Sequence, residues 1–258
     1  MEAAWAAACP WAKAFKDLVF PIFCKQCGVR LLTEENGYFC ARCWEASPRI
    51  ERPFCTGCGR PHQQMVGLGS LSNFPCADCR EHPNKHLRRI FAPALYDGAV
   101  AEAVKLLKFH GRERLAAPLG ELLVDFAARE MDVTAYDLVV PVPLHSVRRR
   151  ARGFNQSKLL AAAALSAFPG AVLDESLRRI RPTRTQSRLK GRSDRRHNVR
   201  GAFAVVGDAV SGKRVLLIDD VATTMGTVTE CGAALQRAGA QWVDVLAVAL
   251  AERSFDAE

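Results

Sequence analysis

The chain has 258 residues, a formal net charge of +9 and an apolar fraction of 49%, which is typical of an ordinary soluble protein of one large or two smaller domains. No apolar run approaches the ~20 residues needed to cross a bilayer. The first residues lack the positive start and long apolar core of a secretion signal. We therefore expect a cytoplasmic protein without a membrane span.

Residues 1–20 carry apolar side chains at roughly helical spacing, from Trp5 to Val19. This spacing predicts a short N-terminal amphipathic helix. Packing of that helix on the rest of the protein is the simpler interpretation, and contact with a membrane surface is the alternative.

Residues 21–87 are rich in cysteine and show little helical periodicity, which predicts a double zinc-ribbon region. Eight of the ten cysteines form four C-x-x-C pairs, a spacing that in a reducing compartment is typical of metal binding rather than of disulfides. Four thiolates around one ion suit structural zinc, so we expect one or two Zn²⁺ ions. Consecutive and interleaved pairing both remain open, and iron–sulfur ligation is a minority alternative. The predicted ligands are Cys24, Cys27, Cys40, Cys43, Cys55, Cys58, Cys76 and Cys79.

Residues 88–258 alternate between strand-like and helix-like patterns, which predicts an α/β domain with a parallel sheet. After a strand and turn near residue 91, the helical patterns cover residues 99–109, 115–130, 155–168 and 226–239. The later strand-like runs cover residues 136–144, 201–206, 213–220 and 242–251.

Two adjacent acids, Asp219 and Asp220, end one of these strand-like runs and are followed by VATTMGT. Ligands of open parallel sheets bind at the carboxyl ends of strands. Two carboxylates can accept from vicinal ribose hydroxyls, directly or around Mg²⁺, while loop and helix N–H groups bind a phosphate. The stretch therefore predicts a phosphorylated-sugar site, and a capped strand end with a threonine turn is the alternative.

The stretch VLLIDDVATTMGTV resembles the phosphoribosyl pyrophosphate (PRPP) signature of type I phosphoribosyltransferases. The wider chain, from about Phe23 onward, resembles the ComF family of competence-associated, amidophosphoribosyltransferase-like proteins. LKFHGR, VVPVPLHSVRRRARGFNQSKLLA and RTQSRLKGRSDRRHNVRGAF carry this resemblance in order. It implies a type I phosphoribosyltransferase fold, a parallel sheet flanked by helices, behind an N-terminal cysteine-rich zinc-ribbon domain. It also implies PRPP and Mg²⁺ as ligands, an acceptor not yet known, and a link to competence and DNA uptake.

The resemblance assigns a role to each matching position. Asp219 and Asp220 would bind the ribose hydroxyls and Mg²⁺, and the loop that follows would wrap the 5′-phosphate. This 5′-phosphate loop comprises Val221, Ala222, Thr223, Thr224, Met225, Gly226 and Thr227. The pyrophosphate loop would comprise Leu144, His145, Ser146, Arg148 and Arg152. A flexible hood would include Arg181, Gln186 and Arg195.

Three of these segments leave alternatives open. Met225 stands where the signature has glycine, the residue that adopts positive φ most easily, so the geometry of the 5′-phosphate loop is in question. His145 would contact pyrophosphate or cap a turn. Lys108, at the end of a helical pattern, would by default be solvated, and reaching the site is the sharper alternative.

Residues 178–200 hold ten lysines and arginines against the single acid Asp194, and so account for the whole net charge. This basic run predicts a mobile lid over pyrophosphate, a surface for single-stranded DNA, or a solvated loop. It has no aromatic residue on which a base would stack. The sequence thus favours a phosphoribosyltransferase, with a non-enzymatic nucleic-acid-binding or PRPP-sensing protein of a DNA-uptake assembly as the alternative.

Overall fold

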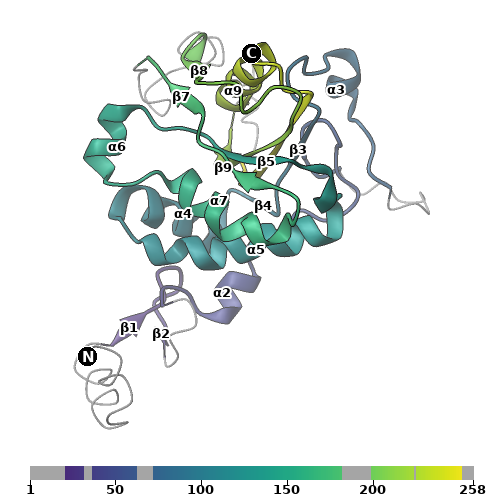
Figure 1. Cartoon of the computed structure of the whole chain (residues 1–258). Helices are drawn as coiled ribbons and strands as arrows, with labels where there is room; N and C mark the ends of the chain where they lie inside the picture. Colours follow the sequence, from purple (N-terminus) through teal and green to yellow (C-terminus); the bar gives the residue numbers. More distant parts are fainter. Residues whose placement is uncertain (1–20, 32–36, 63–71, 182–198, 224, 252–258) are drawn as a thin grey trace, which may run out of the picture.

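The structure is a computed structural model that describes residues 21–31, 37–62, 72–181, 199–223 and 225–251 (Figure 1). The predicted helix over residues 1–20 lies outside these ranges, as do Thr224 and the hood positions Gln186 and Arg195. Within the described ranges, no helix has the length and apolarity that a membrane crossing requires.

A parallel sheet forms the centre of the molecule, in the strand order β3-β10-β9-β5-β6, and β4 pairs with the far end of β10. The apolar sequences of the two central strands fit this position, because seven of nine residues in β9 and eight of nine in β10 are buried. The predicted parallel α/β sheet is confirmed. The strands span β3 Arg89–Phe91, β4 Ala94–Leu95, β5 Leu138–Pro141, β6 Val172–Leu173, β9 Arg214–Ala222 and β10 Trp242–Leu250.

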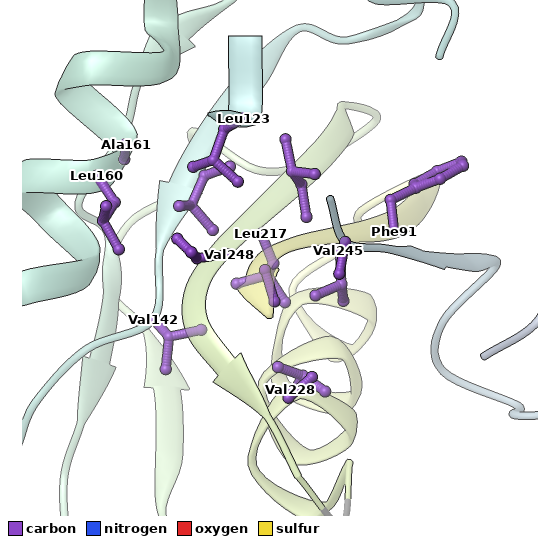
Figure 2. Packing of buried hydrophobic residues seen from close by; sticks show 14 of the residues in the cluster. Phe91, Leu123, Val142, Leu160, Ala161, Leu217, Val228, Val245 and Val248 are labelled. Carbon is purple, nitrogen blue, oxygen red and sulfur yellow. The ribbon is translucent and has the colours of Figure 1, made fainter. Parts of the chain in front are cut away.

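Four longer helices cover the sheet, and they agree with the predicted helical patterns to within a few residues. Helices α5 and α7 pack on each other and on the sheet, and α9 packs against β9 and β10 on the side that carries β7 and β8 (Figure 1). Figure 2 shows the buried core between these layers, with Leu217 of β9 and Val245 of β10 near its centre. The helices span α4 Gly98–His110, α5 Ala116–Glu130, α7 Gln156–Ala164 and α9 Gly226–Arg237, with single 3₁₀ turns at Glu113–Leu115, Val133–Ala135 and Leu165–Ala167.

The strand predicted over residues 201–206 forms, as β8 (Phe203–Val205), but it lies outside the central sheet. It pairs antiparallel with β7 (Leu177–Arg179) to make a two-stranded ribbon. Its two strands lie at the beginning and just after the end of the basic run over residues 178–200, which was predicted as a hood. Its position over α9 brings Arg179 toward the carboxyl end of β9.

The short helix α6 (Ser146–Arg152) is an element that the sequence pattern did not predict. It contains four arginines and buries none of its residues, so it has no apolar face that periodicity could show. Its start is fixed by His145, whose Nδ1 accepts from the Val147 N–H at 3.3 Å.

The cysteine-rich region contains the antiparallel strands β1 (Ile22–Phe23) and β2 (Arg30–Leu31) and the short helices α2 (Ala41–Glu45) and α3 (Ala77–Glu81). Its second half packs directly on the sheet domain. The Phe54 ring is 1% exposed and lies 6.5 Å from the Phe91 ring and 5.9 Å from the Phe126 ring. The second metal cluster, whose Cys55 follows Phe54 in the chain, is therefore joined to the main hydrophobic core.

Candidate functional site

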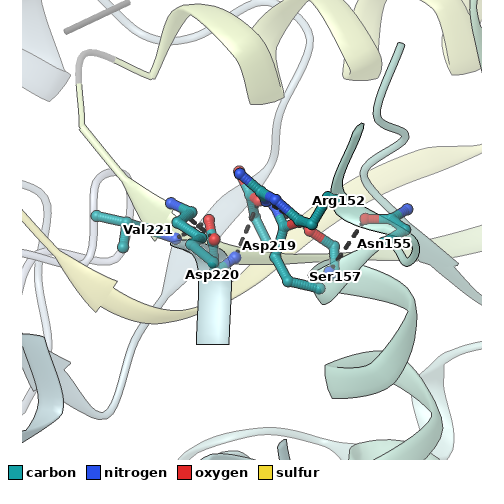
Figure 3. A network of polar contacts seen from close by, with 8 residues as sticks. Arg152, Asn155, Ser157, Asp219, Asp220 and Val221 are labelled. Atoms are coloured by element: carbon teal, nitrogen blue, oxygen red, sulfur yellow. Dashed lines mark hydrogen bonds and ion pairs between the residues drawn. The ribbon is translucent and has the colours of Figure 1, made fainter. Parts of the chain in front are cut away.

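Asp219 and Asp220 lie near the carboxyl end of β9 and are both buried, at 7% and 3% exposure. Asp219 Oδ1 accepts from Ser157 Oγ at 3.1 Å and from the Asp220 N–H at 2.9 Å (Figure 3). Asp220 Oδ1 accepts from the Val221 N–H at 2.7 Å. Burial, reinforced by the neighbouring Asp220 charge, raises the pKa of Asp219 to about 7. The carboxylate pair is thus held in place by polar contacts, in a position where two unpaired charges would be costly.

Lys108 supplies the counter-charge for this pair. Its Nζ lies 2.7 Å from Asp220 Oδ2, and its side chain is 21% exposed. Burial disfavours the lysine charge, but the Asp220 carboxylate outweighs it and holds the pKa of Lys108 above its usual value. The default expectation of a solvated helix-end lysine is therefore wrong, and the alternative, that Lys108 reaches the site, is confirmed.

The loop after the acid pair lines a cleft of about 440 Å³, which we call the β9 cleft. Gly226 is buried as the first residue of α9. Met225 has φ +61°, so it adopts the left-handed conformation expected of glycine, at a cost of about 1–2 kcal/mol for an L-residue. The loop backbone therefore takes its turn without glycine, and Met225 lines the cleft. The other loop residues that line it are Val221, Ala222, Thr223 and Thr227.

The predicted pyrophosphate loop reaches the same cleft in part. Leu144, Arg148 and Arg152 line it, whereas His145 and Ser146 do not. His145 caps α6, and Ser146 lines a neighbouring cavity of about 650 Å³. Among the hood residues, Arg181 Nη2 donates to the Arg200 carbonyl at 2.7 Å and does not line the β9 cleft.

Several residues of the β9 cleft were not predicted from the sequence. Ser157, at the start of α7, holds Asp219, and its place is set by the Asn155 side chain, which caps that helix and also donates to the Val142 carbonyl. Arg152 donates to Gln156 Oε1 (Figure 3). The other unpredicted residues that line the cleft are Phe109, Val142, Pro143, Gln156, Arg179 and Val228.

The charges of the β9 cleft favour an anionic ligand. Four cationic side chains line it against two carboxylates, counted over the described residues. Burial lowers the pKa of the Arg152 guanidinium and that of Arg179. A bound anion would attract these guanidinium groups and so offset the cost of removing them from water. The four cations are Lys108, Arg148, Arg152 and Arg179.

The eight predicted metal ligands form two separate clusters. Within each cluster the four Sγ atoms all lie within 4.8 Å of one another, which establishes consecutive pairing and rules out the interleaved arrangement. The clusters are Cys24, Cys27, Cys40 and Cys43, and Cys55, Cys58, Cys76 and Cys79.

In each cluster one cysteine is surrounded by donors that favour its thiolate. Cys55 Sγ accepts from the N–H groups of Cys58 and Cys76 at 3.4 and 3.2 Å, and Cys24 Sγ accepts from Cys40 N–H at 3.4 Å. A hydrogen bond from the Cys58 thiol, with those N–H groups, lowers the pKa of Cys55 to about 4. Four sulfur ligands at this spacing fit tetrahedral Zn²⁺ and fill its coordination shell. These are therefore two structural zinc sites.

Residues 15–80 match the double zinc ribbon domain family. The chain is 34% identical to the DNA utilization protein YhgH of Escherichia coli O157:H7, over 88% of this chain and 96% of that protein. It is 28% identical to competence protein F of Haemophilus influenzae, over 90% and 98% of the two chains. It is also 28% identical to competence protein ComFC of Streptococcus pneumoniae, over 82% and 87%.

Two solved structures overlap part of the chain. The glutamine PRPP amidotransferase of B. subtilis is 21% identical, over 56% of this chain and 30% of that one, with a TM-score of 0.37. A purine phosphoribosyltransferase of Pyrococcus horikoshii is 13% identical, over 52% and 70%, with a TM-score of 0.32. The parallel α/β sheet and the cysteine-rich double zinc ribbon of the predicted fold class are confirmed. The chain belongs to the ComF family, and in it a double zinc ribbon precedes a parallel α/β domain.

Proposed function

We propose that the β9 cleft binds PRPP together with Mg²⁺. One observation carries the proposal: a buried carboxylate pair, a threonine-bearing turn into a helix, and a group of cationic side chains all line a single cleft of about 440 Å³. A volume of that size suits a small-molecule ligand. Each part of the cleft matches one part of PRPP, because carboxylates accept from hydroxyls, helix starts bind phosphate and arginines bind pyrophosphate.

In this proposal Asp219 and Asp220 accept hydrogen bonds from the ribose hydroxyls, and the loop from Val221 to Thr227 holds the 5′-phosphate. Arg148 and Arg152 face the pyrophosphate, whose charge they offset. The described residues fit Mg²⁺, since carboxylate oxygens are its preferred ligands; Asp219 and Asp220 would hold it, and the bound ion would neutralise charge on the leaving pyrophosphate. Lys108 must then share Asp220 with the ligand or turn toward the pyrophosphate.

Transfer would break the bond from ribose C1 to the pyrophosphate oxygen, which leaves with the bonding electrons, and an acceptor atom would form the new bond to C1. The only acids that line the described part of the cleft are Asp219 and Asp220, and both are engaged by neighbours. Neither is therefore placed as a free general base. An acceptor with its own nucleophilic lone pair fits this arrangement, and the chain would then act as a phosphoribosyltransferase in the cytoplasm, where PRPP is found.

Calorimetry tests this function directly. Wild-type protein is titrated with PRPP in the presence and absence of Mg²⁺, and Asp219→Asn and Asp220→Asn are titrated in parallel. We expect Mg²⁺-dependent binding in the wild type and at least about fivefold weaker binding in each variant, because removing one partner of a buried polar contact costs about 1–3 kcal/mol. Asp208→Asn, an exposed acid outside the cleft, serves as the matched control. The proposal is abandoned if the wild type does not bind PRPP with Mg²⁺.

A second candidate function rests on the names of the relatives, which concern DNA utilization and competence. We infer that the chain takes part in DNA uptake, where the cleft would act as a PRPP sensor and the basic run over residues 178–200 would contact single-stranded DNA. Neutralising phosphates releases counterions, so affinity should fall steeply with salt. Gel-shift titrations at rising salt test this, and a flat response would remove the basic run from DNA contact. PRPP binding without pyrophosphate release would favour the sensor over the enzyme.

A further inference from the structure

Phe109 is the most exposed large apolar side chain in the described part of the chain, at 69%. Phe109 lies near the end of α4 and lines the β9 cleft. Gly111 ends α4 in a left-handed conformation, with φ +62°, and so fixes the direction in which the chain leaves the helix. A phenylalanine held in solvent at the edge of a ligand cleft is a candidate contact for the ligand.

The neighbours of Phe109 define what its ring can contact. The preceding residue, Lys108, is tied to Asp220 at 2.7 Å, so α4 ends beside the carboxylates proposed to hold the ribose. The Arg152 guanidinium carbon lies 5.5 Å from the centroid of the Phe109 ring, within cation–π range. This contact orients the ring and still leaves most of its surface exposed.

We infer that Phe109 is a stacking platform for a flat aromatic ring attached to ribose C1. This inference rests on the proposed function, because it takes the ribose position from it. With the 5′-phosphate in the loop after β9 and the hydroxyls at Asp219 and Asp220, we place a substituent of C1 at the edge formed by Arg152 and Phe109, which belongs to the rest of the cleft. The group that replaces pyrophosphate on ribose C1 would be a nucleobase or a similar heterocycle.

The chemistry of the edge supports an aromatic ring over an aliphatic amine or an amino acid. Stacking on an aromatic side chain is worth about 1–3 kcal/mol per base and tolerates different bases, since each has a π face. Apart from the two engaged aspartates, no acidic side chain lines the described part of the cleft, so nothing there would hold a cationic amine. The product of such a transfer is a nucleoside 5′-monophosphate.

The inference is tested by comparing ribose 5-phosphate with nucleotides that carry a base at C1. Ribose 5-phosphate and each of AMP, GMP, CMP and UMP are titrated by calorimetry into wild type, Phe109→Leu and Phe109→Trp. We expect at least one nucleotide to bind the wild type at least fivefold more tightly than ribose 5-phosphate, which is the lower end of the stacking range. In Phe109→Leu the nucleotide should bind no more tightly than ribose 5-phosphate, whereas Phe109→Trp should keep the difference in affinity. Ribose 5-phosphate itself should bind all three proteins alike.

The possible results distinguish failure of the stacking role of Phe109 from failure of the proposed PRPP site. If ribose 5-phosphate and PRPP bind but the base adds nothing, or if Phe109→Leu keeps the full difference in affinity, the stacking platform is wrong and the PRPP site stands. If neither ribose 5-phosphate nor PRPP binds, both the proposed PRPP site and the stacking role of Phe109 are wrong. Val172→Ala, an exposed apolar residue outside the cleft, is the matched surface control. It should match the wild type with every probe.

Discussion

Met225 shows how a single residue can keep a backbone conformation while changing the surface that it presents. Its φ of +61° places it in the region that favours glycine, so the turn into α9 is formed despite the side chain. The same side chain packs partly against the core and lines the β9 cleft. The Met225 side chain therefore makes the β9 cleft narrower than glycine would, at the point where a phosphate would approach the backbone.

Met225→Gly should tighten PRPP binding several-fold relative to the wild type. Glycine would relieve the left-handed strain and open the cleft, while the unfolded chain would gain about 0.5–1 kcal/mol of conformational freedom. The two effects on folding oppose each other, so the free energy of unfolding should change by no more than about 1 kcal/mol. Calorimetry and denaturant unfolding measure the two quantities, with Met225→Leu as the control that keeps both bulk and strain. Equal affinities in the glycine and leucine variants would show that the methionine does not restrict the loop.

The residues that the sequence could predict are those whose signal is local. Asp219, Asp220 and the loop that follows are adjacent in sequence, and one buried strand places them together at its end. Lys108 and Ser157 reach the same carboxylates from α4 and α7, over separations of more than 60 residues. No pattern in the chain indicates such a contact, because it depends on how the helices pack.

At the level of elements, apolar periodicity predicted the helices and strands that bury a face. Helix α5 and strand β10 were predicted to within one or two residues, because their apolar residues follow the periods of a helix and a buried strand. Helix α6 was not predicted, since none of its residues is buried. The two- and three-residue strands β6 and β7 are too short to show any period.

The contact between α5 and α7 depends on Gly120, which sits inside a helix where glycine is otherwise unfavourable. A Cβ at Gly120 would lie 2.4 Å from the Cβ of Ala163. Real carbon atoms do not approach so closely, so the two helices would have to separate. Glycine is present here for close packing and not for an unusual φ.

Gly120→Ala should therefore destabilise the protein by about 1–3 kcal/mol, the usual cost of overpacking a core. The double variant Gly120→Ala with Ala163→Gly should recover much of the loss, because it moves the methyl group across the same contact. Chemical denaturation of the single and double variants measures both. Gly170→Ala is the control, since its Cβ would meet only the Tyr136 carbonyl, at 3.7 Å. A stable Gly120→Ala protein, or a double variant no better than the single, would contradict the packing argument.

At the scale of the whole molecule, the two metal clusters differ in how they join the core. The cluster that contains Cys55 and Cys58 is attached through Phe54, which packs on Phe91 and Phe126. Gly59, next to Cys58, lies so close to β3 that a Cβ there would be 2.6 Å from the Ile90 carbonyl oxygen. The first cluster lies toward one end of the molecule beside β1, β2 and α2 (Figure 1). Its Cys24 is buried in the core, but its Cys27 is exposed.

Loss of the second zinc should therefore weaken the sheet domain more than loss of the first. Cys58→Ser should release one zinc and lower the melting temperature of the whole chain by about 5 °C or more, since a deficit of a few kcal/mol shifts a protein of this size by that amount. Cys27→Ser should also release one zinc but lower the melting temperature of the main transition by less than Cys58→Ser does. Metal analysis and calorimetric melting of the full chain provide both readouts. Because the two variants remove the same ligand atom and the same ion, equal melting temperatures would mean that the ribbons contribute alike and that the Phe54 contact does not couple zinc to the sheet.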